Sequence, residues 1–89
     1  MSITWSPAKN TQIRERYGIG FERVVVALLE GAILDVRDHP NREKYAHQRQ
    51  YALEIDGYAW VVPFVTDGQD VFLKTIFPSR AATQEYLGG

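Results

Sequence analysis

The fold is decided by residues 47–77, HQRQYALEIDGYAWVVPFVTDGQDVFLKTIF, in which two Asp-Gly pairs separate three β-favourable runs. An Asp-Gly pair between apolar runs is typical of a tight hairpin turn, because both residues tolerate a positive φ angle. We therefore expect residues 47–55, 58–66 and 70–77 to form three antiparallel strands. Pro63 cannot donate a hydrogen bond to a neighbouring strand, so a bulge or an unpaired stretch is expected beside it.

Two helices are predicted before this meander. The first runs from Pro7 to Tyr17, because Ser6 can cap it, proline suits the first helical position and Gly18 can end it. The second covers residues 21–30, where apolar residues recur at the spacing of a helix with one buried face. The expected buried stripe consists of Phe21, Val24, Val25, Leu28 and Leu29. The strand residues expected in the cores on the faces of the sheet include Leu53, Trp60 or Val61, Phe64, Leu73 and Phe77.

The remaining elements are short. Residues 3–5 and 32–37 are predicted strands, residues 38–46 form a polar loop, and a last helix begins at Arg80 with Ser79 as its cap. The order β-α-α-β-β-β-β-α predicts an α+β fold with helices packed on an antiparallel sheet. A chain of 89 residues has room for one hydrophobic core, so residues 1–89 are expected to form a single domain.

Composition excludes several classes of protein. The chain has no cysteine, and therefore no disulfide framework, no thiolate nucleophile and no cysteine-ligated zinc. A net charge of −1 argues against a protein whose whole surface binds nucleic acid. No apolar run approaches the roughly 18 residues of a membrane span, and the first residues do not resemble a secretory signal. We expect a cytoplasmic protein without membrane contact.

Two familiar kinds of binding site are not expected. Residues 18–20 begin a G-x-G motif, but the third glycine of a dinucleotide fingerprint is replaced by Arg23 and a helix precedes it, so this segment connects two helices. His39 and His47 are eight positions apart, with no cysteine and no regular acidic spacing. Neither a metal nor another cofactor is therefore predicted.

The chemistry-bearing residues are concentrated near the ends of strands. Lys74 and Arg80 flank the end of the last strand, where two cations and the first turn of a helix offer donors to a phosphate. His47, Arg49 and Tyr51 share one face of the preceding strand 47–55, because side chains alternate along a strand. If the faces agree, these five residues can converge on one phosphodiester.

Such a group can cleave RNA without metal, since a base, an acid and cations that stabilise the transition state are sufficient. His47 is the best proton carrier, because histidine titrates nearest neutrality. Lys74, Arg80 and Arg49 would hold the phosphate, and Tyr51 would act as an acid or stack on a base. In the alternative interpretation, Tyr51 belongs to the core, Lys74 extends from the sheet into solvent and His47 is an ordinary polar strand residue.

Three segments together carry a resemblance to a known family. ITWSPAKN with RYGIGFERV near the start, AWVVPFV in the middle and LKTIFPSRAATQEYL at the end resemble the BrnT-like group of bacterial type II toxins, within the RelE/ParE superfamily. The resemblance implies a RelE-like ribonuclease that inhibits translation and is neutralised by a cognate antitoxin. Arg80 matches the arginine of the family's strand-to-helix junction, and Arg49 matches basic residues on its preceding strands. The chain departs from typical members in its net charge and its nearly neutral last helix.

The expected function is therefore a toxin that acts as a metal-independent endoribonuclease. His47, Lys74 and Arg80 are its predicted catalytic residues, Arg49 and Tyr51 its predicted substrate-binding residues, and RNA and an antitoxin its predicted partners. A non-catalytic protein-binding domain, either a decayed toxin or a docking module, is the alternative. Lys74 and Arg80 on opposite faces would favour it. The RNA target, ribosome dependence, the antitoxin and a homo- or hetero-oligomeric state stay open.

Overall fold

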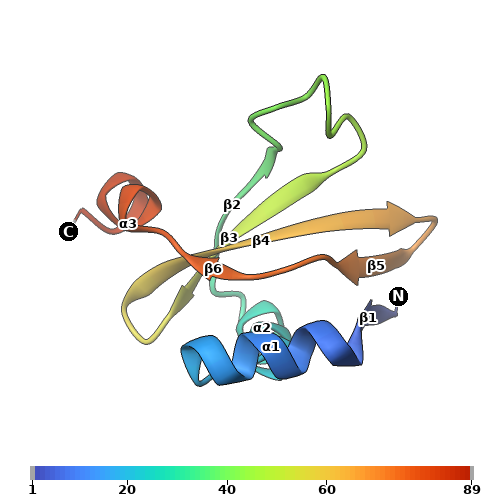
Figure 1. Cartoon of the computed structure of the whole chain (residues 1–89). Helices are drawn as coiled ribbons and strands as arrows, with labels where there is room; N and C mark the ends of the chain where they lie inside the picture. Colours follow the sequence, from blue (N-terminus) through green and yellow to red (C-terminus); the bar gives the residue numbers. More distant parts are fainter. Residues whose placement is uncertain (1, 89) are drawn as a thin grey trace.

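The computed structural model describes residues 2–88, which form one mixed sheet and three helices (Figure 1). The elements are β1 (Ile3–Trp5), α1 (Pro7–Tyr17), α2 (Phe21–Leu29), β2 (Ile33–Asp38), β3 (Arg49–Ile55), β4 (Tyr58–Asp67), β5 (Asp70–Leu73), β6 (Phe77–Pro78) and α3 (Arg80–Leu87). The strand order is β1-β5-β4-β3-β2, with β6 paired to β4. The predicted α+β class is confirmed. None of the helices in residues 2–88 is long and apolar enough to cross a membrane.

The predicted meander is present in β3, β4 and β5. Ile55 pairs with Tyr58, and the two residues between them, Asp56 and Gly57, have φ angles of 53° and 81°. Two consecutive positive φ angles define the turn whose twist matches that of the strands it joins. The Asp-Gly signal therefore fixes both the turn and the antiparallel register of β3 and β4.

The expected bulge lies opposite Pro63. β5 ends at Leu73, which pairs with Phe64, and β6 begins at Phe77, which pairs with Val61. The three residues 74–76 therefore lie opposite only two residues of β4, 62 and 63. The backbone N–H of Lys74 donates to the carbonyl oxygen of Pro63 at 2.8 Å. One extra residue on one strand is the definition of a β-bulge. The single strand predicted over 70–77 is therefore wrong, because the bulge divides it in two.

The sheet is mixed, and the prediction of an entirely antiparallel sheet is wrong. β1 runs parallel to β5, with Ile3 opposite Val71 and Trp5 opposite Leu73. Tight turns impose antiparallel pairing on β3, β4 and β5, whereas no turn joins β1 to β5 and its direction is free. The ring of Trp5 stacks on Phe21 with centroids 5.6 Å apart, which ties this strand to the core.

The main hydrophobic core lies between the sheet and the helices α1 and α2, which cover the same face (Figure 1). Side chains from α2 and from alternate positions of three strands supply it. Its most deeply buried members are Phe21, Val24, Ala27, Leu53, Val62, Leu73 and Ile76.

Two residues predicted for the core are exposed. Leu29 is 80% exposed, because the buried face of α2 centres on Val24 and Leu29 lies about 140° around the helix from it. Phe77 is 37% exposed, while its neighbour Ile76 is buried. The extra residue of the bulge shifts the alternation by one position, so Ile76 takes the inward place that regular alternation would have given to Phe77.

The junction between α1 and α2 is held by a buried asparagine. Asn10 Oδ1 accepts a hydrogen bond from the backbone N–H of Phe21 at 2.8 Å, and Asn10 Nδ2 donates to Glu22 Oε2 at 2.8 Å. The first bond satisfies one of the unpaired donors at the start of α2. Hydrogen bonds from its own backbone N–H and from Asn10 lower the pKa of the Glu22 carboxyl. Asn10 therefore caps a helix eleven residues further along the chain.

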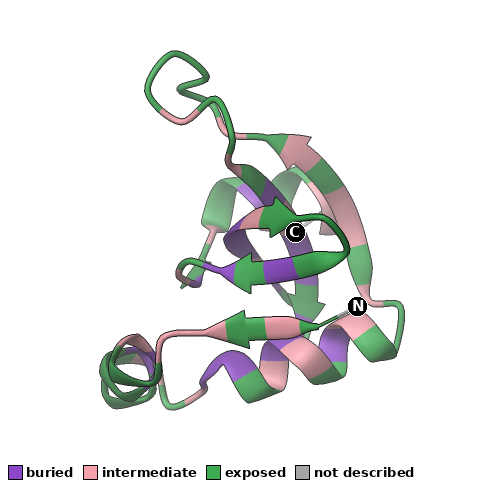
Figure 2. Cartoon of the chain, turned by 90° about the vertical axis from the view of Figure 1, so that its right-hand side faces the viewer, coloured by how far each residue is buried: buried purple, intermediate pink, exposed green. Residues whose placement is uncertain are grey.

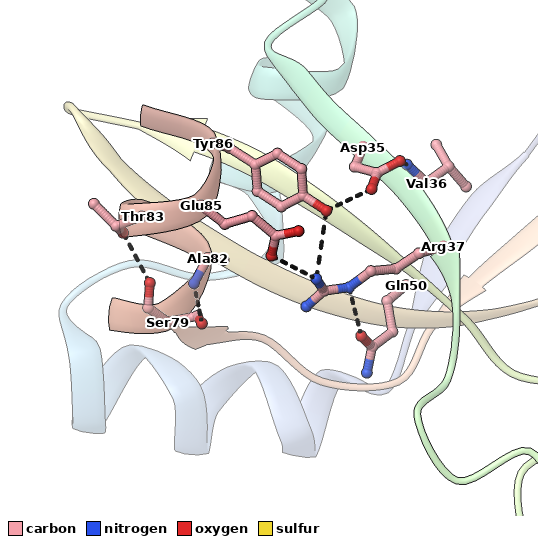
Figure 3. A network of polar contacts seen from close by, with 9 residues as sticks. All are labelled: Asp35, Val36, Arg37, Gln50, Ser79, Ala82, Thr83, Glu85 and Tyr86. Carbon is pink, nitrogen blue, oxygen red and sulfur yellow. Dashed lines mark hydrogen bonds and ion pairs between the residues drawn. The ribbon is translucent and has the colours of Figure 1, made fainter. Parts of the chain in front are cut away.

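The last helix covers the other face of the sheet through a small core of Ala59, Val61 and Ala82. Ser79 caps it as predicted, since its hydroxyl accepts from the backbone N–H of Ala82 at 3.0 Å. A polar network links α3 to β2 and β3 (Figure 3). The hydroxyl of Tyr86 donates to the carboxylate of Asp35.

Arg37 occupies the centre of this network. Its Nε donates to Gln50 Oε1 at 3.3 Å, and its Nη1 donates to the Tyr86 hydroxyl oxygen at 3.4 Å and lies 3.7 Å from Glu85 Oε2 (Figure 3). Gln50 is buried, so this bond gives a partner to a polar group removed from water. Polar contacts therefore help to hold α3 against the sheet, because its apolar contact with the sheet is small.

The pH dependence of the Tyr86→Phe variant tests whether the hydrogen bond between Tyr86 and Asp35 stabilises the protein. The hydrogen bond from Tyr86 lowers the pKa of Asp35, and the same bond raises the pKa of Tyr86. The stabilisation from this hydrogen bond is complete above the pKa of aspartate in the unfolded chain, about 4. It is lost as the pH falls through the lower pKa of Asp35 in the folded protein. It is also lost as pH rises through the raised pKa of Tyr86. We expect the variant to unfold at lower urea than the wild type at pH 7, with a smaller difference at pH 2.5. An equal difference between variant and wild type at pH 7 and at pH 2.5 would show that the variant loses stability through packing and not through the hydrogen bond.

Candidate functional site

Arg49 and Tyr51 lie together on the core-facing side of β3, as alternation predicts. Arg49 pairs with Phe64 and Tyr51 pairs with Val62 across β4. The ring of Tyr51 stacks on Phe64 with centroids 4.1 Å apart. Burial raises the pKa of the Tyr51 hydroxyl, and the charge of Arg49 partly opposes this shift. Tyr51 is thus a weaker acid than free tyrosine.

The Arg49 side chain already has a partner. Its Nε lies 3.6 Å from Asp38 Oδ1, and Asp38 is also the carboxylate that Arg42 contacts at 3.1 Å. Two arginines therefore share one carboxylate at the open end of β2 and β3. A phosphate at Arg49 would have to compete with Asp38.

His47 is not on the strand, contrary to the prediction of a strand over 47–55. It is exposed in a turn, and β3 begins only at Arg49. The loop 39–48 closes on itself, because the backbone N–H of His39 donates to Gln48 and that of Gln48 donates to Tyr45. These bonds end the β2–β3 ladder before it reaches His47. Figure 2 shows the loop extending from the sheet as a largely exposed projection.

Lys74 faces the other side of the sheet from Tyr51. Its Nζ lies 5.6 Å from the ring centroid of Phe72, which is 36% exposed and alternates with the core residues Val71 and Leu73. Since neighbouring side chains on a strand point to opposite faces, Phe72 and the lysine above it lie away from the α1 side.

Arg80 is exposed at the first position of α3. Five residues of mostly extended chain lie between it and Lys74, and the six steps from one Cα atom to the next span up to about 20 Å. Figure 1 shows this segment crossing the sheet from β5 to α3. The structure therefore brings Arg49 and Tyr51 together but leaves His47, Lys74 and Arg80 at three separate places.

A groove that the sequence analysis missed runs between α1 and residues 75–77. Its volume is about 300 Å³, and its helical wall carries Lys9, Gln12 and Arg16. These positions are i, i+3 and i+7 on one face of the helix. That spacing is visible in the sequence, but nothing in the sequence shows which strand lies beside the face.

The C-terminal end of α1 lies beside β6, which precedes Arg80. Tyr17 packs edge-on against Trp60 with centroids 5.5 Å apart, and Trp60 pairs with Pro78. The end of α1 that carries Arg16 is therefore beside the end of β6 that leads into Arg80.

The cations along this path lack carboxylate partners. Arg23, Arg37, Arg42 and Arg49 form the ion pairs within residues 2–88. Lys9, Arg16 and Arg80 form none in the same part of the chain, nor does Lys74 on the other face of the sheet, and no carboxylate lines the groove. Cations without local counter-charges are available to an external anion.

Across the described residues, no group of three or more His, Asp or Glu side chains is arranged to hold a metal ion.

Comparisons with known proteins found no relative of this chain. The chain matches no protein family, no curated protein and no solved structure.

Proposed function

We propose that this chain is a RelE-like toxin of a type II toxin–antitoxin pair, a metal-independent endoribonuclease that acts on cytoplasmic RNA and is neutralised by a cognate antitoxin. One observation supports RNA as the ligand. Lys9 and Arg16 lie on α1 and Arg80 follows β6, and none of the three has an ion-pair partner within residues 2–88. A local row of free cations can bind phosphates although the whole chain is slightly acidic.

In this proposal the cleaved phosphate lies at Arg80. The guanidinium stabilises the charge that develops on the phosphate as the ribose 2′-OH loses its proton to water, attacks the phosphorus and displaces the 5′-oxygen, which takes a proton from water. Lys74 lies over Phe72 on the face of the sheet away from α1, so it does not contact the same phosphate. His47, on its projecting loop, takes no part in proton transfer.

Purified protein and a defined single-stranded RNA test the proposal. Cleavage should proceed in EDTA, leave a 2′,3′-cyclic phosphate and fail when the target ribose lacks its 2′-OH. Cleavage that requires added Mg²⁺, or that proceeds equally on DNA, would contradict the proposed reaction. Growth arrest on expression of the chain alone would connect the reaction to the toxin role.

The His47→Ala variant separates the two mechanisms that the sequence left open. With His47 in an exposed turn, we expect the cleavage rate to fall by less than about tenfold, whereas removal of a general acid or base costs about 10²–10⁴-fold. The rate is measured from single-turnover cleavage between pH 5.5 and 8.5. A larger loss, together with the disappearance of an ionisation near neutrality, would restore His47 as the proton carrier.

A second candidate function, protein binding without catalysis, is favoured by apolar side chains near the open edge of β2. Leu29 is 80% exposed, Ile33 is 42% exposed and Val36 is 36% exposed. β2 ends the strand order, so one of its sides has no strand partner among residues 2–88. A chain that is harmless at high expression and inactive on RNA would favour this function over the toxin.

A further inference from the structure

We infer that the groove between α1 and residues 75–77 holds one unpaired base of the RNA, and that Gln12 binds the edge of this base between the two phosphates that flank it. The inference rests on the proposed function for its ligand, RNA, but it requires no cleavage. It gives α1 a part in selecting the sequence that is bound, separate from the reaction at Arg80.

The size and the floor of the groove fit one base. Its volume is about 300 Å³, at the lower end of the range for small-ligand sites, so it can take one ring system and not a stack of several. Ile13 and Ile76 line the groove and are only 4% and 1% exposed, so they form an apolar floor. The flat face of an unpaired base packs well on such a surface.

The same floor argues against a peptide strand as the ligand. A peptide adds to a sheet by pairing with exposed backbone N–H and C=O groups of an edge strand. Ile76 is packed in the core, so the chain behind the groove offers no such edge at its centre. Recognition in the groove therefore depends on side chains, chiefly those of α1.

The charges on the helical wall fit the phosphates on either side of a base. Lys9 and Arg16 lie about 10 Å apart along the helix axis, one on each side of Gln12. Neither forms an ion pair within residues 2–88, and no carboxylate lines the groove. Arg16 is held in place, because its Cζ lies 5.3 Å from the ring centroid of Tyr17, which packs edge-on against Trp60. Each cation can therefore bind one of the two phosphates.

Gln12 is the residue that can distinguish one base from another. It is exposed on the wall of the groove, and its amide presents an oxygen acceptor beside an N–H donor. Adenine presents the complementary pair, the N6 donor beside the N7 acceptor, and glutamine binds it through two hydrogen bonds. No other base has a donor beside an acceptor on this edge. We therefore expect adenine to be the preferred base.

The binding test uses two fluorescein-labelled heptamers of 2′-O-methyl RNA, which lack the 2′-OH and so cannot react in the proposed way. One heptamer is all uridine, and the other has a single adenosine at its centre. The adenosine should lower the Kd of the wild type about fivefold or more, as expected for one bidentate contact. In Gln12→Leu the two heptamers should bind about equally. Gln69→Leu, the same change at an exposed position between β4 and β5, is the matched control and should keep the preference.

Salt dependence and NMR locate the RNA in the groove. Lys9→Ala and Arg16→Ala should each reduce the slope of log Kd against log salt by about 0.7, the value for one phosphate contact to a single strand. Arg14→Ala, on the same helix but outside the groove, should leave this slope unchanged. The side-chain amide signals of Gln12, assigned by their loss in Gln12→Leu, should shift when the adenosine heptamer is added.

Several results would overturn the inference. They are the failure of both heptamers to bind, equal binding of both by the wild type, and an adenosine preference that survives Gln12→Leu. Unshifted amide signals of Gln12, or salt slopes that Lys9→Ala and Arg16→Ala leave unchanged, would place the RNA elsewhere on the chain and would also overturn it.

Cleavage assays with unmodified RNA keep the two proposals apart. If the heptamers bind as expected but the chain does not cleave RNA, the proposed function fails and the base site stands. If the chain cleaves RNA and Gln12→Leu leaves the adenosine preference unchanged, the base site fails and the proposed function stands.

Discussion

Arg80→Ala is expected to lower the rate of RNA cleavage by about 30- to 1,000-fold, the usual effect of removing one charged contact to a transition state. The physical reason is that Arg80 has no carboxylate partner within residues 2–88 and lies exposed at the first position of α3. Single-turnover rates on one RNA measure the change, and growth of cells that express the variant shows whether arrest is relieved.

Arg42→Ala is the matched control for Arg80→Ala. It removes the same side chain from an exposed position on the loop 39–48, where Arg42 is paired with Asp38. Its rate should stay within about threefold of the wild type, since surface ion pairs contribute little. An Arg80→Ala protein that keeps its melting temperature and cleaves as fast as its parent would remove Arg80 from the proposed site.

The second large effect concerns stability and is expected from Gly20→Ala. A Cβ atom at this position would lie 2.4 Å from Asn10 Oδ1, 2.7 Å from Arg14 Cγ and 2.7 Å from Glu22 Oε1. Asn10 would have to move, and the backbone N–H of Phe21 would lose its buried partner. We expect a loss of about 2–4 kcal/mol in the free energy of unfolding, from steric strain and an unsatisfied donor.

Urea denaturation measures this loss, and an exposed site on α1 supplies the control. Ala8→Ser also adds one heavy atom but leaves the Asn10 contacts intact, so it should change stability by less than about 0.5 kcal/mol. A Gly20→Ala protein as stable as Ala8→Ser would show that the junction between α1 and α2 adapts without strain.

The local features of the fold could be predicted from the sequence. Asp56-Gly57 specifies its turn by backbone conformation alone, and Pro63 predicts a bulge because it lacks an N–H. The parallel pairing of β1 with β5 could not be predicted in this way, since it joins segments that no turn connects. Phe77 was misplaced for a related reason. The position of the bulge fixes which residues face inward, and a proline shows only that a bulge is needed.

The candidate site was less predictable than the fold. Alternation along β3 correctly placed Arg49 beside Tyr51, because both residues belong to one strand. Lys9 and Arg16 were missed because their importance depends on which strand edge lies next to α1. That arrangement is a property of the packed core. His47 was wrongly placed on the strand. Hydrogen bonds within its own loop hold residues 45–48 in a turn, so β3 begins only at Arg49, two residues after His47.

The attachment of α3 has a consequence for the motions of the native protein. Ala82 is the only fully buried residue of this helix, with Tyr86 and Leu87 partly buried beside it, and the polar network around Arg37 and Tyr86 supplies further attachment. A segment with so little buried apolar surface opens at a lower free energy than the core does. We therefore expect the C-terminal helix to detach and reattach while the sheet stays folded, and each opening to bring Arg37 and Gln50 into contact with solvent.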